Sequence, residues 1–229
     1  MTIGGLQKFS LIDYPGKTTA IIFTVGCNFR CRYCHNPELV IPEEYKKEIP
    51  ISEIYNFLES RRGKLDAVCI TGGEPTQHSD LPEMINKIKK MGFLVKLDSN
   101  GSRPEVLDDF IKKNMVDYIA MDVKAPLEDY LKIMGWWVSP EKLKKSINLI
   151  MSSGIEYEFR TTVAKSITSM DDIRKIAQTI EGAENYYLQK FIPTKLIDSS
   201  LKKESSYSDE HLNKIAEEMK RYVKNCSVR

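Results

Sequence analysis

Hydrophobic and polar positions follow two alternating periods along most of the chain. Six segments rich in apolar and β-branched residues predict β-strands, at residues 18–26, 65–73, 93–101, 116–125, 155–164 and 185–193. Charged segments with apolar positions at helical spacing predict helices at residues 51–62, 81–92, 103–114, 139–154, 169–182 and 208–225. Several of these begin at Ser, Asp or Pro and end near Gly or Asn, as helix caps do.

This alternation indicates an α/β fold, because strands separated by helices form a parallel sheet with right-handed crossovers. The near-continuous apolar run at residues 18–25 fits a strand that is covered on both faces. Periodicity leaves two architectures open, an open doubly wound sheet and a partly closed barrel. In both, the ligand site lies at the carboxyl ends of the strands. The chain has 229 residues and no linker or internal repeat, so we expect one domain over residues 1–229.

Charge and hydropathy narrow the class of protein. The 34 basic and 32 acidic residues leave a net charge of +2, which indicates neither a nucleic-acid nor a membrane partner. No apolar run approaches the roughly 18 residues of a membrane helix, and the first residues lack the apolar core of a signal peptide. We therefore expect a cytoplasmic protein, in a compartment where clustered cysteines bind metal more often than they form disulfides.

Three of the five cysteines lie within eight residues, in the stretch "TVGCNFRCRYCHNPEL". Cys27, Cys31 and Cys34 have C-x3-C-x2-C spacing, and thiolates bind both zinc and iron–sulfur clusters. A structural zinc ion needs a fourth ligand, and His35 directly follows Cys34, where adjacent side chains rarely reach one ion. Three thiolates fit a [4Fe–4S] cluster that leaves one iron open. From spacing alone, a zinc knuckle or buried structural cysteines remain the alternative.

The same spacing, with Tyr33 just before the last cysteine, resembles the cluster motif of the radical SAM superfamily. The resemblance extends over most of the chain and implies a partial (β/α)6 barrel of parallel strands with outer helices. It also implies that the open iron is chelated by the amino and carboxylate groups of S-adenosylmethionine (SAM). An electron from the reduced cluster then cleaves the sulfonium to methionine and a 5′-deoxyadenosyl radical.

The motifs at the next strand ends continue this resemblance. "TGGEP", residues 71–75, is similar to the family's GGE motif, so Gly72, Gly73 and Glu74 are expected to hold the methionine amino group. Glycines let the backbone approach a ligand closely, and a carboxylate suits an ammonium group. Taken by itself, however, a Gly-Gly turn after a strand is common.

Two further stretches, "LDSNG" and "MDVKAP", resemble the "DTNG" and "DLK" stretches of glycyl-radical-enzyme activases. In those enzymes the two aspartates and the hydroxyl help to hold a monovalent cation beside the SAM carboxylate. The resemblance therefore assigns Asp98, Ser99 and Asp122 to SAM binding, with a monovalent cation as a further candidate cofactor. Lys124 would add positive charge to this region, and the alternative for it is a surface ion pair.

Four more residues are candidates for SAM contacts. Arg160, near the end of a strand, could reach the SAM carboxylate in a bidentate manner, and its alternative is a solvated side chain. Tyr33 and His35 flank Cys34, and the resemblance places them beside the adenine, with apolar packing as the alternative. Gln189 is the polar candidate in "YYLQKFIP", where this chain lacks the SAM-contacting histidine of formate-lyase activases.

The remaining notable residues have structural interpretations. Cys69 is expected in the core and Cys226 in the terminal tail. Trp136 and Trp137 could belong to the core or line a groove for a substrate peptide.

Two segments point to a particular reaction. "CHNPEL" and the opening "GGLQKFSLIDYPGK", residues 4–17, resemble activating proteins of anaerobic ribonucleoside-triphosphate reductases. The resemblance implies a partner glycyl radical enzyme, from whose glycine Cα a hydrogen atom is removed, and a flavodoxin- or ferredoxin-type electron donor. No side chain need act as acid or base, because the cofactors carry the chemistry. The alternatives are a small-molecule radical SAM enzyme such as a 7-carboxy-7-deazaguanine synthase, and a non-catalytic iron–sulfur electron carrier or zinc module.

Overall fold

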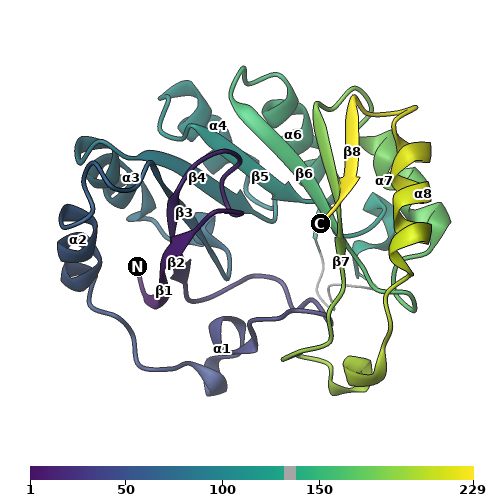
Figure 1. Ribbon diagram of the computed structural model, residues 1–229, viewed down its shortest axis with the longest axis horizontal. Helices are drawn as coiled ribbons and strands as arrows, with labels where there is room; N and C mark the ends of the chain where they lie inside the picture. Colours follow the sequence, from purple (N-terminus) through teal and green to yellow (C-terminus); the bar gives the residue numbers. More distant parts are fainter. Residues whose placement is uncertain (132–137) are drawn as a thin grey trace.

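A single eight-stranded sheet organises the computed structural model, which describes residues 1–131 and 138–229 (Figure 1). The strands are β1 (Ile3–Ser10), β2 (Thr19–Thr24), β3 (Ala67–Gly72), β4 (Leu94–Ser99), β5 (Tyr118–Asp122), β6 (Glu156–Val163), β7 (Asn185–Lys190) and β8 (Asn225–Val228). The α-helices are α1 (Pro37–Val40), α2 (Ile51–Glu59), α3 (Leu81–Lys90), α4 (Pro104–Lys112), α6 (Pro140–Met151), α7 (Met170–Thr179) and α8 (Asp209–Met219). Short 3₁₀ turns cover η1 (Pro42–Glu44), η2 (Pro75–Gln77), η3 (Leu127–Asp129) and η4 (Ser199–Lys203).

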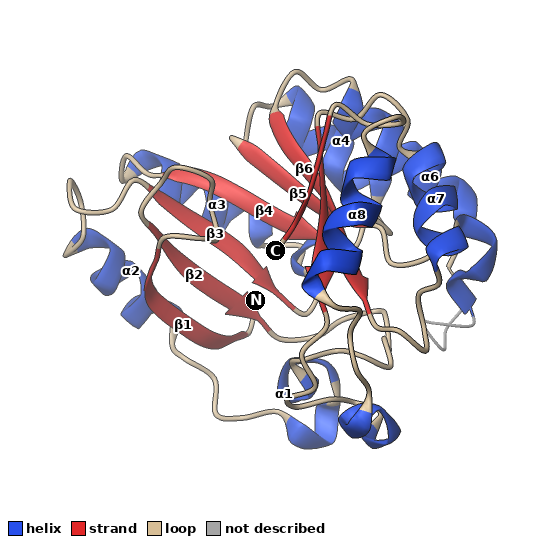
Figure 2. Cartoon of the chain, turned by 45° about the vertical axis from the view of Figure 1, so that its right-hand side comes forward, coloured by secondary structure: helices blue, strands red, loops and turns tan. Residues whose placement is uncertain are grey.

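The order of the strands in the sheet is their order in the chain, from β1 to β8. Strands β2 to β8 pair in parallel and β1 pairs antiparallel with β2. A doubly wound sheet reverses its strand order at a switch point, and this sheet does not. Sequential right-handed crossovers instead place successive helices on one side and curl the sheet, with β1 and β8 at its two edges. The predicted partial barrel with outer helices is therefore confirmed, and Figure 2 shows the curved sheet.

The two faces of the curved sheet carry different side chains. In β4, Val95 and Leu97 are fully buried in the core that also contains Ile85 and Ile88 of α3. The residues that alternate with them, Lys96 and Asp98, belong to the opposite, inner face. Apolar residues thus hold the outer helices, while the inner face is free to carry charged groups.

β2 differs because it is buried along most of its length, as its apolar run predicts. Ala20 and Ile22 join the core beneath the helices, whereas Phe23 faces the inner side and lines the cavity described below.

All six predicted strands and all six predicted helices are present with shorter bounds, and two strands were missed. β1 begins with Ile3, Gly4 and Gly5, a weak strand signal. A Cβ on Gly4 would lie 2.4 Å from the Leu39 side chain, so glycine allows β1 to pack closely there. β8 was missed because the predicted helix over residues 208–225 ends at Met219. Cys226 is therefore not in a free tail but buried in β8.

Helix caps agree with the sequence at several positions. Ser139, Ser169 and Ser208 are N-caps whose side chains accept hydrogen bonds from backbone N–H groups of the first turn. Trp136 and Trp137 lie outside the described residues. Within the described ranges, no helix combines the length and the apolar character needed to cross a membrane.

Candidate functional site

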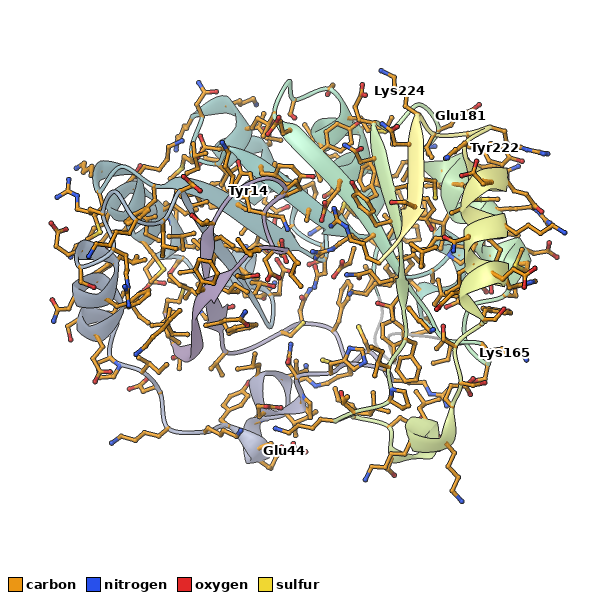
Figure 3. The ribbon with its side chains drawn as sticks, viewed as in Figure 1. Tyr14, Glu44, Lys165, Glu181, Tyr222 and Lys224 are labelled. Carbon is orange, nitrogen blue, oxygen red and sulfur yellow. The ribbon has the colours of Figure 1, made fainter. Side chains whose placement is uncertain are left out.

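One cavity of about 300 Å³ lies at the carboxyl ends of the parallel strands. In Figure 3, Tyr14 marks the side of the sheet where the strands begin, and Glu44 lies near α1, beyond their carboxyl ends. The structure brings every residue predicted for the site to this cavity: Cys27, Cys31, Tyr33, Cys34, His35, Gly72, Gly73, Glu74, Asp98, Ser99, Asp122, Lys124 and Arg160. Residues from five different segments thus share one volume, and the role of each remains a prediction.

The three cysteines lie on the loop between β2 and α1. The Cys34 N–H donates to the Cys31 carbonyl at 2.9 Å, which forms a turn between these two cysteines. Arg30 Nη1 donates to the Cys27 carbonyl at 2.7 Å and fixes the first half of the loop. Burial raises the pKa of the Cys27 thiol to about 12, with a further contribution from the charge of Glu74, and burial raises that of Cys31 to about 11.

The cysteines suit an iron–sulfur cluster in their donor atoms and in their spacing. Across the described ranges, no three His, Cys, Asp or Glu side chains converge as a single metal ion would require. A cluster does not need that convergence, because each thiolate binds a different iron.

Segment 191–198, which follows β7, supports the cysteine loop from one side. His35 Nε2 donates to the Ile192 carbonyl at 2.9 Å, and its ring stacks on Phe191 with centroids 5.6 Å apart. Burial lowers the pKa of His35, so the neutral ring with the proton on Nε2 is favoured. Arg32 pairs with Asp198 at 2.9 Å, and the Asp198 N–H donates to the Arg32 carbonyl at 3.0 Å. The cysteine loop is therefore held in place by the segment that follows β7.

The two glycines of the "TGGEP" turn are required by backbone packing. A Cβ on Gly73 would lie 2.0 Å from the Gly26 carbonyl oxygen, and one on Gly72 would lie 2.4 Å from the Thr24 nitrogen. Gly72 also has φ +117°, a conformation that side chains disfavour. The Glu74 N–H donates to the Gly26 carbonyl at 2.8 Å. The glycines thus bring this turn against the residue that precedes Cys27.

Glu74 is almost fully buried, and its carboxylate is oriented by four hydrogen bonds. Oε1 accepts from the Thr76 N–H, the Thr76 hydroxyl and the Ser99 hydroxyl at 3.2, 2.5 and 2.9 Å. Oε2 accepts from the Asn100 N–H at 2.6 Å. Burial still raises the pKa of Glu74 above its usual value, despite these donors. A cation at Oε2 would relieve that cost, which makes this carboxylate a fitting ammonium ligand.

A row of alternating charges crosses the inner face of β4, β5 and β6. Arg160 Nε lies 2.8 Å from Asp122 Oδ1, and its Nη1 lies 3.1 Å from Asp98 Oδ2. Each aspartate has a second partner, Lys96 at 3.1 Å for Asp98 and Lys124 at 3.0 Å for Asp122. Arg160 and Lys124 are therefore neither solvated nor in surface pairs, since their side chains are 11% and 15% exposed.

This row shifts the titration of both aspartates. Burial alone would raise the pKa of each aspartate. The positive charges of Arg160 and Lys124 instead lower the pKa of Asp122 below its usual value, and those of Arg160 and Lys96 lower the pKa of Asp98. The guanidinium of Arg160 thus supplies positive charge to the two carboxylates at which a monovalent cation was expected.

Tyr33 gives a further indication that the cavity is built for a ligand. Its ring is buried and lines the cavity, and its hydroxyl has no hydrogen-bond partner among the described residues. Buried hydroxyls are normally paired, so a polar group of a bound molecule would complete this site.

A wider groove of about 790 Å³ adjoins the cavity and shares His35, Arg160 and Gln189 with it. Its rim includes Leu11 and Ile12, from the turn after β1, whose exposed fractions are 64% and 82%. Ile192, after β7, is 60% exposed and also lines it. Exposed apolar side chains at the mouth of a polar cavity are typical of a binding surface.

Sequence reasoning missed several polar residues of the site. Lys96 and Glu158 are fully buried inside β4 and β6, and each lies two residues before a predicted site residue. That period-2 spacing was the signal that could have found them. Asn100 and Thr76 orient Glu74 but were not predicted as site residues, although Asn100 lies in the "LDSNG" stretch and Thr76 directly follows "TGGEP".

Comparisons with known proteins agree with this geometry. The family model of the Radical SAM superfamily matches residues 21–180, well over half of the chain. A Methanocaldococcus jannaschii protein named as a glycyl-radical enzyme activating enzyme is 34% identical over 232 residues, covering 99% of this chain and 95% of that protein. The pyruvate formate-lyase-activating enzyme of Clostridium pasteurianum is 24% identical, covering 83% of this chain and 81% of the enzyme.

Solved structures show the same fold. SuiB of Streptococcus suis, in its crystal structure bound to S-adenosylmethionine, superimposes with a TM-score of 0.69 at 16% identity. The match covers 91% of this chain and 49% of SuiB, so this chain spans about half of that protein.

Proposed function

This chain belongs to the radical SAM superfamily and to its branch of glycyl-radical-enzyme activases, and we propose that its substrate is a glycine of an anaerobic ribonucleoside-triphosphate reductase. The observation that carries the proposal is the cavity itself. It gathers the cysteine loop, Glu74 and the Asp98–Arg160–Asp122 row beside a groove that is open to a protein segment.

The side chains have distinct roles in this proposal. Cys27, Cys31 and Cys34 would hold the [4Fe–4S] cluster, and the Glu74 carboxylate would accept the SAM ammonium group. When bound, the cluster and SAM supply the electron and the carbon radical that remove a hydrogen atom from glycine. The protein binds, orients and shields the reacting groups.

The inner charged row would receive the SAM carboxylate. Lys124 and Arg160 are the cations available to it, while Ser99 orients Glu74. A monovalent cation beside Asp98 and Asp122 is part of the proposal. It would share the aspartates with Arg160, so potassium or sodium should tighten SAM binding only modestly.

The choice of reductase as partner rests on the first residues of the chain. The segment 4–17, which resembles activating proteins of anaerobic reductases, forms β1 and the turn that follows it. That turn carries Leu11 and Ile12 on the rim of the groove. The part of the chain that points to this partner therefore lies where a partner segment would enter.

An external reductant must supply the electron, and we propose a flavodoxin- or ferredoxin-type donor. We further propose that the protein acts in the cytoplasm. In that reducing compartment the clustered cysteines would stay available as cluster ligands rather than form disulfides.

The experiment that tests the function is electron paramagnetic resonance on an anaerobic, reduced mixture. It contains this protein with its cluster, SAM and the anaerobic reductase from the same organism. A glycyl-radical doublet that requires all three components supports the proposal. If SAM is cleaved to 5′-deoxyadenosine and no doublet forms, the reductase is not the partner. Turnover of a small molecule such as the 7-carboxy-7-deazaguanine precursor would then favour the alternative.

A rim variant tests the place of the partner in the same assay. Ile12→Asp puts a charge on the most exposed apolar side chain of the groove. We expect the rate of glycyl-radical formation to fall at least tenfold, because a charge at an apolar contact is costly. Cleavage of SAM without partner should stay unchanged. Ile51→Asp, at an exposed position on α2 outside the groove, is the matched control.

A further inference from the structure

Asn100 connects the two halves of the proposed site. It follows β4 directly and is 5% exposed. Its backbone N–H donates to Glu74 Oε2 at 2.6 Å, next to the carboxylate proposed for SAM. Its side chain points the other way, toward the cysteine loop.

The orientation of the Asn100 amide follows from an unambiguous donor. The backbone N–H of Ser102 lies 3.0 Å from Oδ1, and a backbone N–H can only donate, so this atom must be the oxygen. The nitrogen Nδ2 then faces Asn28 Oδ1 at 2.9 Å and Cys27 Sγ at 3.9 Å. Its two hydrogens serve these two acceptors.

The neighbouring amide completes the network. Because Asn28 Oδ1 accepts from Asn100, Asn28 Nδ2 is directed to Ser102 Oγ, at 2.9 Å. Cys27 Sγ also receives the Phe29 N–H at 3.3 Å. Asn100 is thus held by contacts on both ends of its amide, with one N–H directed at the sulfur of Cys27.

Hydrogen bonds to cysteine sulfur are among the factors that set the reduction potential of an iron–sulfur cluster. Reduction adds an electron whose negative charge spreads onto the sulfurs, and a donor stabilises that charge. We propose that Asn100 is a positioning residue that raises the reduction potential of the cluster by donating from its side-chain amide to Cys27. This inference rests on the proposed function, because it requires the cluster on the three cysteines.

The test is a redox titration of the cluster in the reconstituted protein, followed by absorbance and electron paramagnetic resonance. Asn100→Ala removes the donor and leaves the backbone N–H to Glu74. We expect the ratio of reduced to oxidised cluster at a fixed potential to fall by about two- to tenfold, as one modest hydrogen bond allows. A tenfold fall corresponds to about 59 mV for one electron.

Two further variants keep the test decisive. Asn100→Leu has a similar size and carries neither the donor nor a charge, so it should also lower the potential even if the alanine variant assembles poorly. Ser102→Ala loosens the same network through Asn28 but keeps the Asn100 donor, so its potential should match the wild type. Unchanged potentials in both Asn100 variants, or an equal fall in Ser102→Ala, would overturn the inference. Failure of the wild type to bind a cluster would instead overturn the proposed function.

Discussion

Replacing Arg160 with methionine tests whether the inner face depends on its guanidinium. The substitution keeps an unbranched side chain and removes three ion-pair contacts, to Asp122 at 2.8 Å, to Asp98 at 3.1 Å and to Glu158 at 3.7 Å. It leaves the largely buried carboxylates of Asp98 and Asp122 on adjacent strands with one lysine each, while Glu158 keeps Lys96 and Arg229.

The magnitude follows from burial and from the remaining partners. Removing one member of a buried ion pair costs about 3–5 kcal/mol. Asp98 keeps Lys96 at 3.1 Å, and Asp122 keeps Lys124 at 3.0 Å with a side chain that is 28% exposed. These partners reduce the penalty, so we expect the free energy of unfolding to fall by about 2–3 kcal/mol at pH 7.

The effect should depend on pH with a definite sign. In the wild type the pKa of both aspartates is lowered, so their stabilisation is present above their unfolded pKa and is lost as pH falls through the lower folded value. Without Arg160, burial raises the pKa of at least one carboxyl above its unfolded value. The resulting destabilisation is full at pH 7 and is relieved as pH falls through that raised pKa. The deficit of Arg160→Met should therefore shrink between pH 7 and about pH 4.5.

Urea unfolding of the cluster-free, reduced protein at several pH values measures this deficit. Arg174→Met is the matched control, because Arg174 pairs with Asp171 at 2.6 Å in an exposed position. Such surface pairs contribute about 0–1 kcal/mol. A deficit for Arg160→Met no larger than that of the control, or one that does not change with pH, would refute the role assigned to the guanidinium.

Three further substitutions test the proposed cofactor ligands and the turn that carries one of them. Glu74→Gln should weaken SAM binding by roughly 10- to 100-fold, the range for a hydrogen bond to a charged group. Anaerobic calorimetry on cluster-loaded protein measures the dissociation constant, and an unchanged value would contradict the role of Glu74 as ammonium ligand. Cys34→Ala should abolish both the cluster absorbance and 5′-deoxyadenosine formation, whereas Cys226→Ala should retain them; SAM cleavage by Cys34→Ala would exclude the cluster assignment. Gly73→Ala should lower the free energy of unfolding by about 1–3 kcal/mol, because its Cβ would meet the Gly26 carbonyl at 2.0 Å. An unfolding midpoint at the same urea concentration as the wild type would show that the turn can move to accommodate the methyl group.

Most strands and helices could be predicted because the residues that recur at strand or helix spacing in the sequence are the ones buried in the core. In α3, Leu81, Met84, Ile85 and Ile88 recur at helical spacing and all four are buried. β8 could not be predicted in this way, since four residues without a strong pattern become a strand only by pairing with β7. β1 likewise depends on close packing of Gly4 against Leu39, a contact that no local period reveals.

At the site, the sequence predicted which residues would gather at the strand ends but not their contacts. Arg160 was expected at the SAM carboxylate, and the structure shows which carboxylates of the protein it contacts, Asp98 and Asp122. Such contacts depend on the register between strands, which places Asp122 opposite Arg160 in the β5–β6 pair. A single sequence shows which residues of one strand share a face, but not the register between neighbouring strands. The charged row could therefore not be predicted from the sequence.

The sequential strand order explains why motifs that are consecutive in the sequence contact one another in the structure. Each motif lies at the carboxyl end of one strand, so the order of motifs along the chain becomes their order across the cavity. The turn after β3 therefore contacts the cysteine loop after β2 through Gly26 on one side. On its other side, Glu74 contacts Ser99 and Asn100 after β4. Asn100 in turn reaches back to Cys27, so three adjacent strand ends form one hydrogen-bonded unit. Because the unit is closed, the position of the Glu74 carboxylate and that of the Cys27 sulfur cannot vary independently. Glu74→Asp, which keeps the charge but shortens the side chain, should therefore shift the potential of the cluster in the direction of the Asn100 variants, and by less, because it disturbs the donor only through the backbone.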